Sequence, residues 1–502
     1  MKKFLYGFLI LVTLIIVGIL VVLNVDPFDP FEPLYSENCA GCHGTDMMGV
    51  ENSGPALVGS VLTGGDSVTE ISRSITLGAP GKGMPAWSDE LFEEDIRALA
   101  IYIAERRVDR LFTDFKVDAS LTLPKGVVKS EKENFTVELV TDRLDPLPFS
   151  IAPLPDGRIL VSEKMKGLRI VSQNGEISEL IRDTPEVHDD NFELILVWGW
   201  GWMLDVELHP DYENNGWIYI HHTERCTDCV LPPRSMNRVV RGRIREGRWV
   251  DEEEIWAPGE QYYSFIPDVA AGGRLAFDES GYLYISVGIK GRSNFHDIQD
   301  LSTPYGKIHR VHDDGRVPKD NPFVEFELAY PTTWSYGHRS PQGLEFDPYS
   351  GELWSTEMGP RGGDELNLLL PGRNYGWPLY SKGLDYDGTP IEYGKQLGIE
   401  FDLNDIEQPV VDLTPGPAVS SFTLYRGNKF PHWENSFLVG SLRATELYRI
   451  VLENNRYVRS EVLLTKLARI RDVEVGFDGL VYLLLEHADG GQIIRLVPSK
   501  DQ

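Results

Sequence analysis

The sequence is short of two things, cysteine and positive charge. Only four cysteines occur in 502 residues, and 48 basic residues stand against 77 acidic ones, which gives a net charge of −29. This balance excludes nucleic acid and anionic lipid as charge-matched partners, and any charged protein partner is expected to be basic. The length predicts two or more domains. Abundant glycine (48) and aromatics (11%) favour an all-β architecture with many tight turns.

One apolar run of 20 residues without charge, Phe4–Leu23, follows Lys2 and Lys3. At ~1.5 Å per residue this run can span a hydrocarbon core of ~30 Å. No small-residue cleavage site follows it, so we expect an uncleaved single-pass anchor over residues 1–25, with the lysines in the cytoplasm. The soluble domains would then lie on the periplasmic side of a bacterial inner membrane. A proline-rich, extended linker is expected over residues 26–33.

Two of the cysteines, Cys39 and Cys42, lie in the pentapeptide CAGCH, which ends in His43. This spacing is what covalent haem attachment needs, because each thiol forms a thioether with the porphyrin and the next imidazole takes one axial position on the iron. The alternative is a redox or zinc CxxC that happens to precede a histidine. The sequence therefore predicts haem c and an electron-transfer role.

The second axial ligand cannot be a nearby histidine, because none occurs between residues 44 and 112. Met47 and Met48 are too near His43 for the chain to reach the far face of the haem. Met84, in the segment GKGMPAW, is far enough along the chain, and its thioether would raise the reduction potential of the iron. The alternative is that Met84 only fills the core.

A small helical unit is expected over residues 34–110. The pattern predicts a first helix over Tyr35–Cys42 and a closing helix over Leu91–Arg107, which has apolar residues at helical spacing. The order of CAGCH, a GPALVG stretch and GMPAW resembles that of class I c-type cytochromes.

Residues 111–135 have the mixed polar composition of a linker, and a different pattern begins at residue 136. Short β-branched and aromatic runs alternate with turn residues. One theme, two strands around a turn, recurs six times at roughly 60-residue spacing, which predicts a six-bladed β-propeller over residues 136–498. The repeats are Asp156–Ile177, Gly216–Val250, Gly281–Val317, Gly351–Trp377, Trp433–Val458 and Asp478–Val497.

The other two cysteines, Cys226 and Cys229, form a second CxxC that no histidine follows, so it is not a second haem site. We expect a local disulfide outside the cytoplasm. A zinc half-site with His221 and His222 is the alternative.

The propeller region resembles the PQQ-dependent glucose/sorbosone dehydrogenase family, also called aldose sugar dehydrogenases. The resemblance spans the whole region and rests on several motifs in the family's order. They are GGRLAF from Gly272, YGHRSPQGL from Tyr336, EMGPRGGDELN from Glu357, NYGWP from Asn374 and RIRDV from Arg469.

The resemblance implies pyrroloquinoline quinone (PQQ), a tricarboxylate quinone, together with Ca²⁺. It places PQQ-binding cations at Arg339, Arg443, Arg469 and Arg471, whose guanidinium groups suit carboxylates. It also places a cofactor-side Ca²⁺ on the carbonyls of Gly359 and Pro360, and a second, structural Ca²⁺ at Glu365 and Tyr375.

The sequence departs from the family around the substrate. The family's general base, a histidine two residues before Gly-Gly-Arg, corresponds to Ala270. Losing a general base typically costs 10²–10⁴-fold in rate. Asp268 and His296 are the candidate substitutes. Three further departures are Trp200 for glutamine, Ile289 for aspartate and Ser340 for asparagine.

Together these patterns predict a membrane-anchored quinohaem oxidoreductase. It would pass electrons from a sugar or alcohol through PQQ to haem c and then to a respiratory acceptor. The first alternative is a non-catalytic propeller that binds a ligand and is attached to an electron-transfer cytochrome. The second is a simple electron shuttle.

Overall fold

The computed structural model describes residues 31–107, 117–118, 121–189, 199–226, 229, 233–290, 295–386, 388–391 and 393–499. The chain divides into two compact units between Asp109 and Arg110. Within the described part of the chain, no helix is long and apolar enough to cross a bilayer. The expected anchor over residues 1–25 lies outside that part.

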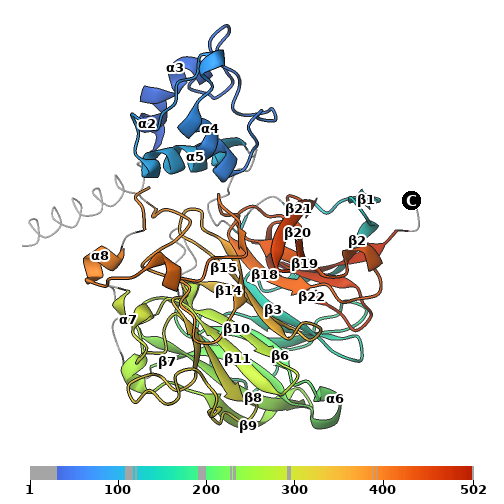
Figure 1. The fold of residues 1–502 in the computed structure, drawn as a ribbon. Coiled ribbons are helices and arrows are strands. Elements are labelled where there is room, and N and C mark those ends of the chain that lie inside the picture. The colour runs from blue at the N-terminus through green and yellow to red at the C-terminus, as the bar shows by residue number, and fades with distance from the viewer. Residues whose placement is uncertain are drawn as a thin grey trace, which may run out of the picture. The chain divides into compact units, whose positions relative to one another are not determined.

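The first unit is helical (Figure 1). Its helices are α2 (Phe31–Asn38), α3 (Ala40–His43), α4 (Val68–Leu77), the 3₁₀ turn η1 (Pro80–Lys82) and α5 (Glu93–Arg107). The first helix begins earlier than the sequence suggested and is interrupted at Cys39. Phe31–Pro33, expected to be extended linker, form the first turn of α2, where a proline is tolerated because the N–H there has no helical partner.

Helix α5 forms the centre of this unit. Leu99, Ala100 and Ile101 are fully buried, and the ring of Tyr102 packs against that of Tyr35 at 5.6 Å between centroids. The Tyr35 hydroxyl donates to the carbonyl of Gly44 at 2.8 Å. Helix α2 is thereby tied both to the core and to the segment that follows the haem motif.

The second unit consists of six antiparallel sheets, which are the blades of a propeller. Blade 1 contains β3 (Pro148–Pro153), β4 (Ile159–Glu163) and β5 (Gly167–Val171). Blade 2 contains β6 (Met203–Leu208), β7 (Ile218–Arg225), β8 (Ser235–Arg245) and β9 (Arg248–Trp256). Blade 3 contains β10 (Gly272–Phe277), β11 (Tyr282–Val287), β12 (Lys307–His312) and β13 (Thr333–Tyr336).

Blade 4 contains β14 (Pro341–Asp347), β15 (Glu352–Glu357), β16 (Glu365–Leu369) and β17 (Val411–Asp412). Blade 5 contains β18 (Val419–Leu424), β19 (Ser436–Ser441), β20 (Leu447–Glu453) and β21 (Arg456–Leu464). Blade 6 contains β22 (Arg469–Val475), β23 (Val481–Glu486), β24 (Gly491–Pro498), β2 (Asn134–Leu144) and β1 (Val128–Lys129). Short helices lie in the loops: α6 (Tyr212–Asn215), α7 (His296–Gln299), α8 (Tyr393–Leu397), η2 (Glu260–Tyr262), η3 (Asp268–Ala270), η4 (Leu403–Asp405) and η5 (Pro431–Trp433).

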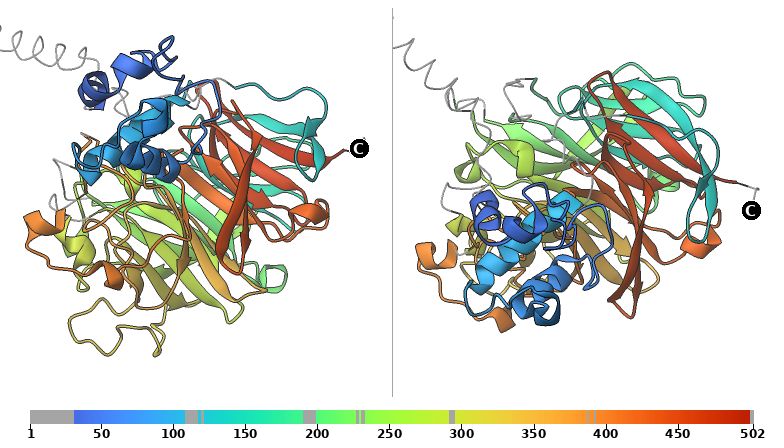
Figure 2. Two further views of the ribbon diagram at one scale, coloured as in Figure 1. Left: turned by 45° about the horizontal axis from the view of Figure 1, so that its top comes forward. Right: turned by 90° about the horizontal axis from the view of Figure 1, so that it is seen from above.

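The six-bladed propeller predicted from the repeats is confirmed. Each repeat covers the second and third strands of a blade, while the inner strands β3, β6, β10, β14, β18 and β22 form a closed ring of neighbours. The N-terminal strand β2 closes the ring by pairing with β24, with Phe135 opposite Pro498 and Leu144 opposite Gly491. Figure 2 shows these cyan and red strands side by side in both views. Blade 6 is thereby completed by strands from both ends of the propeller sequence.

One guanidinium, that of Arg274 on β10, connects the inner strands across the axis. It forms ion pairs with Asp205 on β6 at 3.2 Å and with Asp472 on β22 at 2.9 Å. It also donates to the carbonyls of Gln342 on β14 at 2.8 Å and Phe149 on β3 at 3.4 Å. Because Arg274 belongs to blade 3, this one group joins five of the six blades.

The two glycines before Arg274 allow this approach. Gly273 has φ +100°, and a Cβ there would lie 2.5 Å from Cδ1 of Leu204 on the neighbouring blade. Gly272 has φ +72°, and a Cβ there would collide with the backbone of Ser286 and Gly288. These φ values favour glycine, which accounts for the Gly-Gly-Arg order in physical terms.

Carboxyl groups gather at the opposite end of the inner strands. Glu207, Glu345 and Glu474 lie near the ends of β6, β14 and β22. Burial raises the pKa of Glu345 to about 8 and raises the pKa values of Glu207 and Glu474 well above normal, with repulsion from neighbouring carboxylates adding to the effect. Glu345 is therefore largely protonated at neutral pH, and the other two hold their protons to a higher pH than an ordinary glutamate does.

The second CxxC is a disulfide. Cys226 and Cys229 are bonded, and Cys226 N–H donates to the carbonyl of Arg234 at 2.9 Å at the base of the β7–β8 loop. The disulfide prediction is confirmed, and the zinc half-site is excluded because the thiols are consumed. His221 and His222 are instead buried in blade 2.

Replacing Arg274 by methionine should destabilise the propeller by about 3–5 kcal/mol, because Asp205 and Asp472 would remain buried without their cation. Denaturant unfolding followed by tryptophan fluorescence measures the loss. Arg316→Met, at an exposed hairpin residue paired only with Asp314, is the control and should change stability little. A loss below about 1 kcal/mol for Arg274→Met would contradict the role assigned to the axial guanidinium.

Candidate functional site

The histidine of the CxxCH motif is held in one tautomer. His43 Nδ1 lies 2.8 Å from the carbonyl oxygen of Pro55. A carbonyl only accepts hydrogen bonds, so Nδ1 carries the proton and Nε2 keeps a lone pair for a metal. Cys42 is exposed, Cys39 is partly buried, and neither forms a disulfide. These donors fit covalently attached haem.

The chain after the motif folds back tightly to bring Pro55 to His43. Gly49 N–H donates to the His43 carbonyl at 2.8 Å. At Gly54 a Cβ would lie only 2.6 Å from the carbonyl oxygen of Cys42, so any side chain there would collide with the haem motif. The Gly-Pro pair of the GPALVG stretch therefore serves the imidazole directly.

Met84 lies on a closed loop after α4. An antiparallel bridge joins it to Ala79, with Ala79 N–H donating to the Met84 carbonyl at 2.9 Å across η1. Its side chain is partly exposed, whereas Met47 is buried in the unit and Met48 is 60% exposed. A rigid loop presenting a thioether suits the proposed axial role, which remains a prediction.

In the propeller, two of the predicted arginines share one carboxylate. Arg469 Nε and Arg471 Nε, both at the start of β22, donate to the two oxygens of Glu486 at 2.7 and 2.8 Å. Lys164, which follows β4, donates to the same carboxylate at 2.5 Å. We call these four residues the Glu486 cluster, and all four are buried.

The Glu486 cluster carries excess positive charge. Burial, followed by the charge of Arg471, lowers the pKa of Lys164 to about 7, although the contact with Glu486 acts in the opposite direction. Burial alone would raise the pKa of Glu486, but Arg471, Lys164 and Arg469 hold it well below its usual value. Two guanidinium cations and one lysine thus surround a single carboxylate in a chain of net charge −29. Such a cluster fits a multiply charged carboxylate ligand.

The other two arginines lie together at the same end of the blades. Both Arg339 and Arg443 act on Asp364, whose pKa burial raises to about 7 and these two cations partly lower. Arg339 also donates to the carbonyls of Met358 and Gly359 at 3.0 and 3.3 Å. Asp364 in turn accepts from the Gly359 N–H at 3.0 Å, which fixes the loop beneath Arg339.

Gln342 connects the two groups. It accepts from Arg471 at 3.1 Å and donates to the hydroxyl of Ser340, the neighbour of Arg339, at 2.9 Å. All of these residues lie at the start of an inner strand or at the end of a second strand, which is one and the same end of an antiparallel blade. The structure thus brings the predicted cations together around the axis. Sequence reasoning missed Lys164 and Glu486, because each only follows an apolar strand and carries no further signal.

Some of the expected calcium ligands already have hydrogen-bond partners within the protein. The Gly359 carbonyl already accepts from Arg339, and the Tyr375 hydroxyl donates to the Leu368 carbonyl at 2.6 Å. No group of three or more His, Cys, Asp or Glu side chains that could hold a metal ion occurs among the described residues. A site built mainly from carbonyls such as those of Gly359 and Pro360 therefore remains a prediction.

At Glu365 a bound cation would reduce the repulsion between two neighbouring carboxylates. It lies directly opposite Glu357 on the neighbouring strand, and burial followed by that carboxylate raises its pKa well above normal. Its Oε2 accepts only a neutral amide hydrogen bond from Asn367 at 3.1 Å. A hard cation would relieve this repulsion.

Asp268 cannot act as the substitute base. Both of its oxygens are engaged: they accept from Gly201 N–H at 2.8 Å, Thr223 at 2.6 Å and Ser235 at 2.7 Å, and they pair with Lys290. The side chains of Asp268 and Lys290 are completely buried. This ion pair positions the loop around Ala270 and offers no basic oxygen to a substrate.

The remaining departures are accounted for locally. Ala270 ends η3 and is half-buried. His296 is exposed at the start of α7, and Ile289 packs into the apolar core of blade 3. Trp200 donates to the Phe265 carbonyl at 3.0 Å. The neighbouring Trp202 belongs to a buried cluster with Phe149, Met165 and Ala271.

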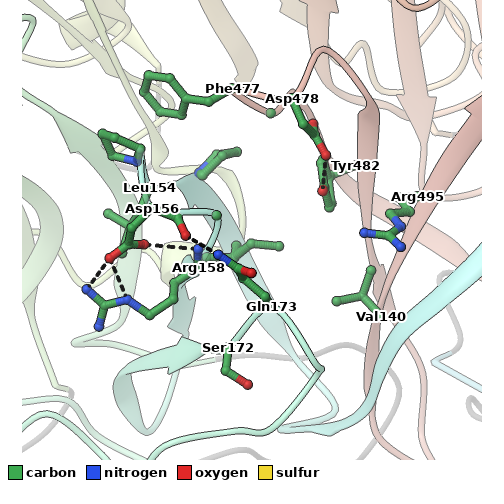
Figure 3. A pocket seen from close by; sticks show the side chains of 15 residues that line it. Val140, Leu154, Asp156, Arg158, Ser172, Gln173, Phe477, Asp478, Tyr482 and Arg495 are labelled. Carbon is green, nitrogen blue, oxygen red and sulfur yellow. Dashed lines mark hydrogen bonds and ion pairs between the residues drawn. The ribbon is translucent and has the colours of Figure 1, made fainter.

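Two surface cavities of about 480 and 470 Å³ lie at the other end of the blades. Figure 3 shows the first, beside the turn that joins β3 to β4. Its polar groups pair with one another, Arg158 with Asp156 at 2.8 Å and Tyr482 with Asp478 at 2.9 Å. Lys164 lies at the opposite end of β4, so these cavities are separate from the cation groups.

Comparison with known proteins identifies similarities for both units. A family model described as glucose/sorbosone dehydrogenase matches residues 146–495, and one described as cbb3-type cytochrome c oxidase subunit III matches residues 27–103. The chain is 32% identical over 368 residues to aldose sugar dehydrogenase YliI of Escherichia coli, covering 72% of this chain and 92% of that protein. Residues of the cytochrome unit are 43% identical over 76 residues to subunit CcoP of Azospirillum brasilense, covering 14% of this chain and 25% of that protein.

Solved structures give the same result for the propeller. The crystal structure of the soluble aldose sugar dehydrogenase from Escherichia coli in its apo form has a TM-score of 0.63 at 31% identity, covering 73% of this chain and all of that one. A structure titled as a glucose dehydrogenase has a TM-score of 0.61 at 34% identity, covering 72% of this chain and 99% of that one. A PQQ-bound aldose sugar dehydrogenase from Streptomyces coelicolor shares the fold, with a TM-score of 0.54 at 24% identity, covering 73% of this chain and 98% of that one.

Met84→Ala should remove the methionine ligand of the haem. We expect loss of the methionine-to-iron charge-transfer band in the oxidised spectrum and a lower reduction potential, because a thioether stabilises Fe(II). Met48→Ala, at a 60% exposed methionine in the same unit, is the matched control and should leave both unchanged. Retention of the band in Met84→Ala would mean that another side chain is the ligand.

Proposed function

The chain belongs to the glucose/sorbosone dehydrogenase family and carries a cytochrome c domain ahead of its propeller, and we propose that it is a quinohaem oxidoreductase acting on a sugar or an alcohol. The Glu486 cluster is the observation that carries the proposal, because three buried cations around one carboxylate suit a tricarboxylate cofactor. Arg339 and Arg443 would complete the set from blades 4 and 5.

The residues of the propeller have three tasks in this proposal. Lys164, Arg469 and Arg471 bind the carboxylates of PQQ and exclude water from them. Arg339 and the carbonyls of Gly359 and Pro360 orient its quinone edge, with Ca²⁺ on those carbonyls. When bound, PQQ supplies two-electron oxidation chemistry, and haem c supplies a one-electron redox centre.

Placing both cofactors on one chain replaces a diffusional encounter by an intramolecular one at high effective concentration. His43 and Met84 would hold the iron, and the thioether of Met84 would favour the reduced state. The likeness of the cytochrome unit to CcoP subunits supports a respiratory acceptor. The acidic charge of the chain supports a basic docking surface on that acceptor.

The proposed location is the periplasmic side of a bacterial inner membrane. Three features support it: the apolar run Phe4–Leu23, the haem motif, and the disulfide Cys226–Cys229, since disulfides persist in oxidising compartments. We propose residues 1–25 as a single-pass anchor and residues 34–110 and 136–498 as the two soluble domains.

A second candidate function is a propeller that binds PQQ without oxidising a substrate. The observation in its favour is the sealed environment of Asp268 beside Ala270, which leaves this loop without a proton acceptor. Reconstituting the holo-cytochrome with PQQ and Ca²⁺ tests both functions. Haem reduction by a member of a panel of sugars, alcohols and aldehydes supports the dehydrogenase. Saturable PQQ binding without haem reduction by any of them supports the second candidate.

Arg471→Gln should weaken PQQ binding by roughly 10- to 100-fold, because it removes a charge-assisted hydrogen bond to a carboxylate. Quenching of tryptophan fluorescence by PQQ measures the affinity. Arg316→Gln, at an exposed arginine of blade 3, is the control and should bind as the wild type does. Equal affinities for the wild-type protein and Arg471→Gln would remove the main support for the proposed cofactor site.

Ala270→His should restore a proton acceptor at the family's position. If the missing base limits the reaction, haem reduction by the best substrate should accelerate by about 100-fold or more. Ala270→Asn, similar in size but without a basic nitrogen, controls for the added bulk. Equal rates for the histidine and asparagine variants would show that proton abstraction at this position does not limit the enzyme.

A further inference from the structure

Lys164 is incompletely partnered for a buried ammonium. An ammonium group has three N–H donors. Within the described part of the chain, its one hydrogen-bond partner is Glu486 Oε1. The rings of Phe149 and Trp202 lie 5.7 and 5.8 Å from Nζ, and the residue is only 5% exposed. The remaining donors therefore face a dry, largely aromatic environment next to the group of cations.

The charges around Lys164 make its own charge unfavourable. Glu486 at the end of β23 is the carboxylate that Lys164 contacts, and it is shared with Arg469 and Arg471 on β22. Arg274 on β10, 4.6 Å from the centroid of the Phe149 ring, adds a further cation, although Asp205 and Asp472 balance its charge. An arginine cannot give up its proton at these pH values, but a lysine can. Lys164 is thus the member of the cluster that can adjust its charge.

We propose that Lys164 is a third anchor for a carboxylate of the cofactor and that it takes up one proton from solvent when that carboxylate binds. The inference rests on the proposed function, in which Lys164 already contacts the cofactor, and it adds the uptake of one proton. The proton adds to the neutral amine to form an ammonium, which then donates to the carboxylate. No electron moves in this step.

The pH dependence of PQQ affinity follows from the protonation state of Lys164 in the free protein. Burial and Arg471 lower the pKa of Lys164 to about 7, so the amine is mostly neutral above pH 7 and must be protonated on binding. A carboxylate beside it raises that pKa again. Affinity is therefore highest below pH 7 and falls as the pH rises, by roughly 50-fold between pH 7 and pH 9 if Lys164 stays protonated in the complex. Loading of the cofactor would be tighter in a mildly acidic compartment.

The test measures PQQ affinity between pH 6 and pH 9 at constant Ca²⁺, together with proton uptake by calorimetry in two buffers of different ionisation enthalpy. The wild-type protein should show the 50-fold decline and take up close to one proton per PQQ at pH 8. Lys164→Arg, which stays charged, should show neither. Lys164→Gln should bind weakly at every pH. Lys166→Gln, at an exposed lysine paired with Asp189, should behave as the wild type does.

The same variants distinguish the effect of Lys164 from that of a second titrating group, Asp364. The pKa of Asp364 is also raised to about 7, mainly by burial, so its ionisation beside Arg339 and Arg443 can weaken anion binding. Any slope that remains in Lys164→Arg belongs to Asp364, and the difference from the wild type belongs to Lys164. Calorimetry on the unmodified protein needs no variant to fold.

Three results would overturn the inference. They are equal pH slopes for the wild type and Lys164→Arg, wild-type affinity in Lys164→Gln at pH 6, and no proton uptake by the wild type at pH 8. In each of these cases PQQ still binds, and the proposed cofactor site stands. Absence of saturable PQQ binding to the wild type at pH 6 would instead overturn the proposed function, and this inference with it.

Discussion

The geometry of the propeller depends on a single buried guanidinium. Each blade of such a fold packs mainly against its two neighbours, so errors in angle can accumulate around the ring. Arg274 counters this by reaching strands of four other blades, with Asp205 and Asp472 compensating its charge. The cations of the candidate site belong to blades 1, 4, 5 and 6, so their spacing depends on this axial contact. The Gly-Gly pair before Arg274 is the local condition for it.

The sequence could predict those features that depend on residues close together in the chain. The CxxCH motif, the six repeats and the second cysteine pair each involve residues close together in the chain, and the structure agrees with them. The Glu486 cluster could not be predicted in the same way, because Lys164 and Glu486 are 322 residues apart and meet only when the ring closes. The start of α2 at Phe31 was missed for a smaller reason: a proline reads as a breaker, yet it fits the first turn of a helix.

Asp268 illustrates how burial decides the use of a side chain. Its position in the sequence, two residues before Ala270, made it a reasonable substitute for a general base. In the fold it accepts from three donors and from Lys290, and water does not reach it. With both oxygens engaged and the side chain fully buried, this carboxylate is closed to a substrate, and its contribution is to fix the loop. Lys164 shows the converse, because a cation with too few partners keeps its capacity to change protonation.

The carboxyl groups at the far end of the inner strands affect the stability of the fold at high pH. The pKa of Glu345 is raised to about 8 and those of Glu207 and Glu474 are raised as well, so stability is lost as pH rises through those values. Their ionisation would place like charges close together at the far ends of β6, β14 and β22. Alkaline unfolding should therefore start from within the axis and spread outward, while the peripheral strands are still paired.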